Sequence, residues 1–97
     1  MAQRSGQTTV VTSGTAVPLA GSYVNADGPV SIKALEANTG KCYIGNDGSD
    51  DVTTNNGYEL GAGDYVVLNY VGGLDKILVD ASDNGQAVCW LILGPME

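Results

Sequence analysis

Closely spaced turn sequences divide this chain of 97 residues into segments of strand length. Glycine, often after Asn or Asp, supplies the positive φ angles that tight hairpin turns need. The turn sequences are SG (13–14), ADGP (26–29), NTG (38–40), NDG (46–48), NNG (55–57), GAGD (61–64), GG (72–73) and DNG (83–85). This spacing favours antiparallel β structure throughout the chain.

The segments between the turns are rich in Val, Ile, Thr and Tyr, which suit a pleated, half-buried surface. No window shows a convincing helical period. The predicted strands are residues 8–12, 15–19, 30–35, 41–44, 65–70, 76–80 and 86–93, with a short additional strand at 52–54 left open. We therefore predict one all-β domain over residues 8–97, a β-sandwich or jelly roll of about seven or eight short antiparallel strands.

Alternation predicts which side chains of each strand face the core. In three strands the alternation predicts one apolar face and one face exposed to solvent. The residues predicted to point away from the core are Ser31, Lys33, Lys41, Tyr43, Lys76, Leu78 and Asp80. The inward residues of these strands are Val30, Ile32 and Ala34, then Cys42 and Ile44, then Ile77 and Val79.

The last predicted strand, AVCWLIL, is apolar on both faces and so needs cover on both. A second subunit is the favoured cover, and the alternative is a central strand covered by the chain's own N-terminal arm. The small, polar residues 1–7 read as a flexible arm that orders against a partner. The predicted interface residues are Met1, Ala2, Gln3, Arg4, Val88, Trp90 and Ile92.

Net charge limits the partners of the chain. Eleven acids against four cations leave a net charge of −7, so a run of phosphates cannot be neutralised and nucleic acid is not an expected partner. Anionic membrane surfaces are excluded on the same ground. The sequence also shows no secretory signal and no apolar run of membrane-spanning length, which predicts synthesis in the cytoplasm.

The two cysteines, Cys42 and Cys89, lie in apolar strand-like segments. Their spacing matches neither a zinc site nor a C-x-x-C redox motif. Two buried thiols are the favoured interpretation, and a disulfide between neighbouring strands is the alternative.

Residues capable of catalysis are scarce. The chain has no His, which removes His-dependent triads and most zinc sites. The acidic run NDGSDD contains Asp47, Asp50 and Asp51 but lacks the order of a Ca²⁺ loop, so a solvated loop is favoured. Tyr and Trp side chains leave sugar binding open. We expect a protein that is not an enzyme and holds no cofactor or metal.

Several segments together resemble small β proteins of tailed bacteriophage virions. They are SGTAVPLA, VSIKALEANTGKCYIGNDG, TTNNGYELGAGDYVVL and LDKILVDASDNGQAVCWLIL, which lie between about residues 13 and 93. The shared cadence is a strand of the type x-I-K-A, an NTG turn, YIG, a Gly- and Asn-rich loop, G-Y-x-L-x-x-G, and a final apolar strand.

The resemblance implies a capsid decoration (cement) protein on the outer surface of a phage head, bound to the major capsid protein as a dimer or trimer. It equally covers domains of head or tail fibres, which would be present in few copies. A non-viral sandwich that binds glycan or Ca²⁺ is the remaining alternative.

Overall fold

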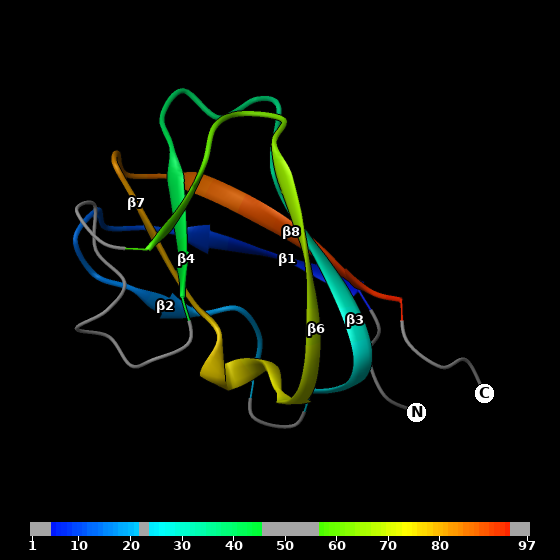
Figure 1. The fold of residues 1–97 in the computed structure, drawn as a ribbon. Coiled ribbons are helices and arrows are strands. Elements are labelled where there is room, and N and C mark those ends of the chain that lie inside the picture. Colours follow the sequence, from blue (N-terminus) through cyan, green and yellow to red (C-terminus); the bar gives the residue numbers. More distant parts are fainter. Residues whose placement is uncertain (1–4, 22–23, 46–56, 94–97) are drawn as a thin grey trace.

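The computed structural model describes residues 5–21, 24–45 and 57–93 and confirms the prediction of a small all-β domain. Two four-stranded antiparallel sheets account for these residues (Figure 1). The strands are β1 (Ser5–Val10), β2 (Val17–Pro18), β3 (Asn25–Ala34), β4 (Cys42–Gly45), β5 (Tyr58–Leu60), β6 (Tyr65–Gly73), β7 (Leu78–Ala81) and β8 (Gln86–Ile92). One 3₁₀ turn, η2 (Leu74–Lys76), joins β6 to β7.

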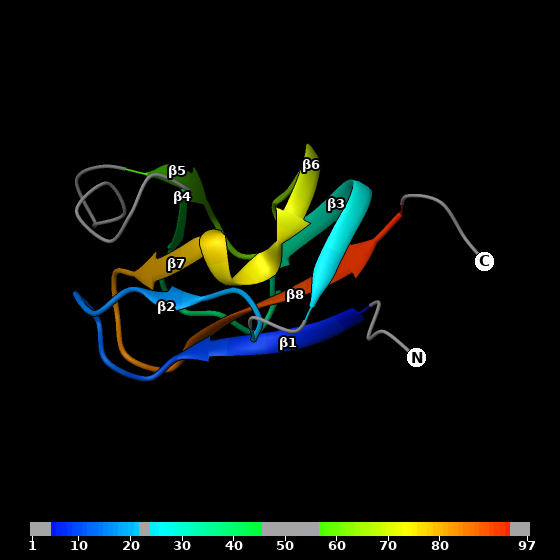
Figure 2. The ribbon, with the colours of Figure 1, turned by 90° about the horizontal axis from the view of Figure 1, so that it is seen from below.

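The two sheets form the two layers of a sandwich, seen along their edges in Figure 2. Sheet A has the strand order β1-β8-β3-β6, and sheet B has the order β2-β7-β4-β5. Most strands that follow one another in the sequence lie in different sheets, so most connections cross from one layer to the other. Consequently β8, the last strand, lies between β1 and β3 rather than at an edge.

A single apolar core lies between the sheets. Sheet A contributes Val30, Ile32 and Ala34 from β3 and Val88, Trp90 and Ile92 from β8, none more than 4% exposed. Sheet B contributes Cys42, Ile44, Leu60, Val79 and Ala81. The predicted inward faces of these strands are confirmed, because a period of two places alternate side chains on one side of a sheet.

The ADGP sequence is not a turn, contrary to prediction. Residues 26–29 lie inside β3, which begins at Asn25 and pairs with β6 along its whole length. Pro29 is tolerated because its missing N–H would face β8 where that ladder ends: Leu93 N donates to Pro29 O at 2.7 Å. The extended pairing with β6 outweighs the local turn preference of Asp-Gly-Pro.

Other boundaries also differ from the sequence prediction. β1 begins at Ser5, so Ser5, Gly6 and Gln7 of the predicted arm pair with β8 instead. β5, between Gly57 and Gly61, was not predicted, because three residues are too few to show alternation. Lys76 lies in η2, not in a strand. The predicted strand at 52–54 and residues 1–4 lie outside the described residues.

Two side chains on the outer face of sheet B are buried, although the sequence predicted that they would be exposed to solvent. Asp80 is 1% exposed and Tyr43 is 9% exposed, although both alternate with core residues. The loop after β1 covers Asp80, since Gly14 N donates to Asp80 Oδ1 at 2.9 Å. Gly57, which precedes β5 beside β4, approaches Tyr43 closely, because a side chain at position 57 would place its Cβ 3.1 Å from Tyr43 Cβ. Alternation predicts the direction of a side chain, but not which loop lies over it.

Candidate interaction surface

The outward side chains of sheet A form a candidate interaction surface. This surface, called the sheet A face below, comprises Gln7, Ser31, Lys33, Tyr65, Val67, Asn69, Cys89, Leu91 and Leu93. These residues alternate along their strands with buried residues such as Ile32 and Trp90, and they therefore point away from the core.

Strand register brings apolar residues from distant parts of the sequence together on the sheet A face. One row across the sheet runs through Ser5, Leu91, Ser31 and Val67. Leu91 is 49% exposed and Val67 48% exposed, so this row presents two apolar side chains to solvent.

The next row runs through Gln7, Cys89, Lys33 and Tyr65. Tyr65 is 67% exposed, the most exposed aromatic residue among the described part of the chain, and Cys89 is half-buried with its thiol donating to Lys33 O at 3.7 Å. Exposed tyrosines offer a large rigid apolar area with one polar end, which suits protein contacts.

Charge is nearly absent from the sheet A face. Lys33 is the one charged side chain among the described residues that form it, and its Nζ lies 3.6 Å from Glu36 Oε2 at the margin. None of the described side chains of the sheet A face is a carboxylate, although the chain has a net charge of −7. Depletion of charge at the centre of a surface and the presence of exposed apolar side chains are typical of protein interfaces.

Three of the predicted interface residues are core residues instead. Val88, Trp90 and Ile92 are 0%, 4% and 3% exposed and pack in the core between the sheets. The apolar pattern of β8 predicted cover on both sides. In the structure the side of Val88, Trp90 and Ile92 is covered by sheet B, and the side of Cys89 and Leu91 is open. The pattern does not distinguish the two sides, since both are apolar. Met1, Ala2, Gln3 and Arg4 lie outside the described residues.

The described part of the N-terminal segment, Ser5–Val10, does not cover the outward side of β8. β1 pairs with β8 edge to edge within sheet A, so it extends the sheet A face instead of hiding it. Cys42 and Cys89 are free thiols, as the favoured interpretation predicted. Cys42 is buried in the core, whereas Cys89 is only half-buried.

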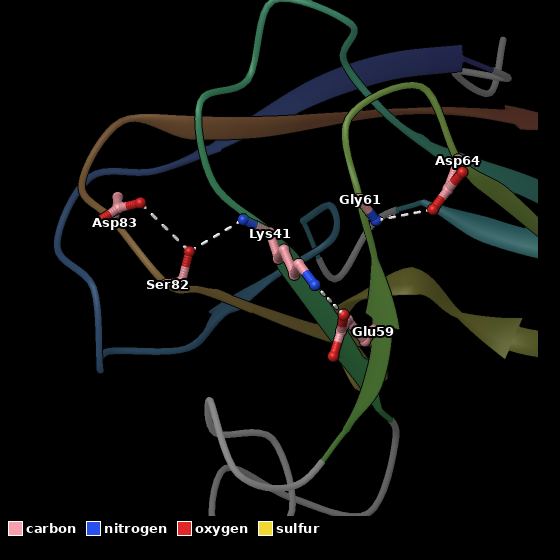
Figure 3. Close-up of polar contacts among 6 residues, drawn as sticks. All are labelled: Lys41, Glu59, Gly61, Asp64, Ser82 and Asp83. Atoms are coloured by element: carbon pink, nitrogen blue, oxygen red, sulfur yellow. Dashed lines mark hydrogen bonds and ion pairs between the residues drawn. The ribbon is translucent and has the colours of Figure 1, made fainter.

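A polar hollow of about 550 Å³ lies at one end of sheet B. Its lining residues are Asn38, Thr39, Gly40, Lys41, Tyr43, Glu59, Gly61, Ala62, Ser82 and Asp83. Figure 3 shows the hydrogen bonds that join polar groups at and beside this hollow. Lys41 Nζ donates to Glu59 Oε2 at 2.6 Å, which raises the pKa of Lys41 through that hydrogen bond and the opposite charge.

Further polar groups at and beside the hollow also have internal partners. Ser82 Oγ accepts from Lys41 N at 2.9 Å and donates to Asp83 Oδ2 at 3.3 Å. Asp64 Oδ2 accepts from Gly61 N at 3.0 Å in the turn before β6. The contacts of Lys41 join the loop after β3 to strand β5 and to the loop after β7, whereas the bond to Asp64 closes the turn between β5 and β6. Tyr43 presents little of its ring there, being 9% exposed.

Two amide side chains, of the half-buried Asn38 and the buried Gln86, hold the 35–41 loop on β8, and the sequence did not predict this contact. Asn38 Nδ2 donates to Ala87 O at 2.8 Å and Asn38 Oδ1 accepts from Ala87 N at 3.0 Å, as a neighbouring strand would. Gln86 Oε1 accepts from Thr39 N and Gly40 N at 2.8 and 2.9 Å. The NTG sequence pointed to a turn here, but nothing in it indicates which strand the turn contacts.

The described chain is therefore a two-layer antiparallel β-sandwich with one nearly uncharged outer face. Comparison with models of protein families, with curated proteins and with solved structures found no match. In the part of the chain that the structure describes, no helix has the length and apolar character needed to cross a membrane. The acidic run with Asp47, Asp50 and Asp51 lies outside the described residues.

Proposed function

We propose that this chain is a structural protein of a bacteriophage particle, a capsid decoration protein that attaches to the major capsid protein on the outer surface of the head. The observation that carries the proposal is the sheet A face: an exposed, nearly uncharged surface on an otherwise acidic domain. The resemblance of the sequence to small β proteins of tailed phage virions supplies the partner.

The sheet A face suits repeated contacts of modest strength. Leu91, Val67 and Tyr65 are about half exposed or more, so covering each of them would contribute on the order of 1 kcal/mol. Many copies on a lattice multiply such contacts, because a subunit that touches two capsid subunits binds the second one at high effective concentration. A decoration protein stabilises the shell in this way without a chemical reaction.

The rigidity of the sheet A face also supports this role. Its central strands, β8 and β3, are paired on both sides, and their inward residues are fully packed in the core. The surface is therefore preorganised, and little conformational entropy is lost on binding. The net charge of −7 fits a place on the outside of the head, away from packaged DNA.

The copy number of the chain in purified particles tests the proposal. Quantitative mass spectrometry should find a number of copies comparable to that of the major capsid protein. A few copies per particle would favour the fibre role, and absence of the chain from particles would overturn a virion role altogether.

A binding experiment tests the surface itself. Val67→Lys should weaken attachment to particles stripped of the protein, because it places a hydrated ammonium on the sheet A face. Val11→Lys is the matched control, since Val11 is 71% exposed in the loop after β1 and lies outside that face. Both variants should keep the melting temperature of the wild type. Equal attachment of the two variants would remove the sheet A face as the contact surface.

A further inference from the structure

The free edges of the sandwich differ in length and in chemistry. β2 and β5, the edges of sheet B, have two and three residues, and β2 ends in Pro18. β1 has six residues with polar, exposed Gln7 and Thr9 at its edge. β6 has nine residues, Tyr65–Gly73, with no charged residue and no proline. Soluble proteins normally protect a long edge strand with charges, proline or a covering segment, because an open edge pairs with other strands.

The backbone groups at the open edge of β6 can be assigned from the hydrogen bonds on its other side. Ala34 N donates to Asp64 O at 2.9 Å, and Leu74 N donates to Val24 O at 2.8 Å, both in the register of the β3–β6 pair. Hydrogen-bonded positions alternate along an antiparallel pair. The even-numbered residues of β6 therefore bond to β3. The N–H and C=O groups of Tyr65, Val67 and Asn69 point to the open edge.

The apolar side chains on the inner side of β6 are only partly buried. Val66 and Leu68 pack against the core but are only half-buried, whereas Val30 and Ile32 of the neighbouring β3 are 0% exposed. The other side of β6 carries Tyr65 and Val67, both exposed. One more strand along this edge would cover side chains in both layers as well as pair the backbone.

We propose that the edge of β6 pairs antiparallel with β6 of a second copy of this chain, which joins two A sheets into one eight-stranded sheet. A twofold axis beside Leu68 places Val67 opposite Asn69 of the second copy. The N–H and C=O groups that these two residues direct to the open edge can then bond to each other. Like charges do not oppose this contact, because the chain has no charged residue between Asp64 and Asp75 despite its net charge of −7. The inference does not depend on a role in a virion.

The mass of the purified protein in solution tests the pairing. Sedimentation over a broad range of concentration should show a species of twice the chain mass of 9.9 kDa that dissociates on dilution. Asn69→Pro should abolish the dimer, because it removes an outward N–H while breaking no bond to β3. Thr9→Pro is the matched control at the β1 edge, and it should remain dimeric. A wild type that stays monomeric, or a dimeric Asn69→Pro variant, would overturn the proposal.

Amide hydrogen exchange of the wild type tests it without a substitution. The amides of Tyr65, Val67 and Asn69 should be protected at high protein concentration and exchange rapidly after dilution. The amides of Val66 and Leu68, which bond to β3, should be protected in both states and serve as internal controls. Rapid exchange of the odd-numbered amides at every concentration would contradict the β6 pairing, whatever other contact holds a dimer together.

Discussion

At the residue scale, three polar side chains lie in environments that the sequence analysis did not predict. Asn38, Gln86 and Asp80 lie in turns or at strand ends in the sequence, yet Gln86 and Asp80 are 5% and 1% exposed and Asn38 is half-buried. Each of them bonds to the backbone of a segment far away in the sequence. Buried polar groups persist in proteins when such bonds satisfy them.

We predict that Asn38→Ala lowers the free energy of unfolding by about 1–3 kcal/mol, because Ala87 N loses its acceptor. Ala87 O loses one donor and keeps the bond from Leu35 N at 3.1 Å. Urea denaturation measures the change. Gln7→Ala removes an exposed amide from β1 and serves as the control, with a change of about 0.5 kcal/mol or less. An equal loss in the two variants would contradict the role given to Asn38.

The buried thiol of Cys42 predicts a pH dependence of stability. Burial raises the pKa of Cys42 above its ordinary value of 9.0, while the hydrogen bond from Asn38 acts in the opposite direction. The unfolded chain therefore loses this proton at lower pH than the folded chain. The stabilising contribution of the thiol is complete below about pH 8 and declines as the pH rises through about 9 and beyond.

Thermal unfolding of the wild type and of Cys42→Ala across that pH range measures the effect. The wild type should lose stability more steeply with rising pH than the variant, which has no thiol at this position. Parallel decline of the two proteins would show that Cys42 ionises alike in the folded and unfolded chain.

At the element scale, loops rather than strands decide which faces of the sheets are open. The loop after β1 lies against β7 through Asp80, whose Oδ1 accepts from Gly14 N and Ala81 N at 2.9 and 2.8 Å. Asp80 Oδ2 is buried and has no hydrogen-bond partner in the structure. The carboxylate thus acts as the anchor of this loop through one of its two oxygens.

We predict that Asp80→Ala costs about 1–3 kcal/mol of folding free energy, because it leaves two N–H groups unpaired. Asp80→Asn should cost clearly less, since the amide oxygen accepts the same two bonds. Denaturant unfolding of both variants measures the difference, and hydrogen exchange at Gly14 reports the loop directly. If the Asn variant is as unstable as the Ala variant, the bonds to Oδ1 do not account for the role of Asp80.

At the scale of the whole molecule, two neighbouring residues of β8 separate the core from the sheet A face. Trp90 is 4% exposed between the sheets, and Leu91 is 49% exposed on the other side. The same strand therefore carries both the packing that stabilises the fold and the surface that we propose binds a partner.

We predict that Trp90→Ala lowers the free energy of unfolding by about 3–5 kcal/mol, a large part of the roughly 5–15 kcal/mol typical of a domain. Leu91→Ala should change it by about 0.5 kcal/mol. Thermal and urea unfolding measure both. A stable, well-folded Trp90→Ala protein would contradict the burial of this side chain in the core.

Local sequence was sufficient to predict the fold class and most inward faces. Gly with Asn or Asp between short runs of Val, Ile and Tyr favours hairpins, and alternation assigns Ile32 or Ile44 to the core because a strand has a period of two. The two thiols were predicted from the apolar setting of each cysteine. These properties depend on residues near one another in the chain.

Tertiary structure alone decided the rest. The ADGP sequence became part of β3 because pairing with the whole of β6 outweighs a local turn preference. Asp80 is buried because the loop after β1, distant in the sequence, binds its carboxylate. The apolar pattern of β8 is equal on both sides, so only the position of sheet B made Trp90 core and Leu91 surface. Which face is open, and which edge is unpaired, follow from contacts between residues distant in the sequence.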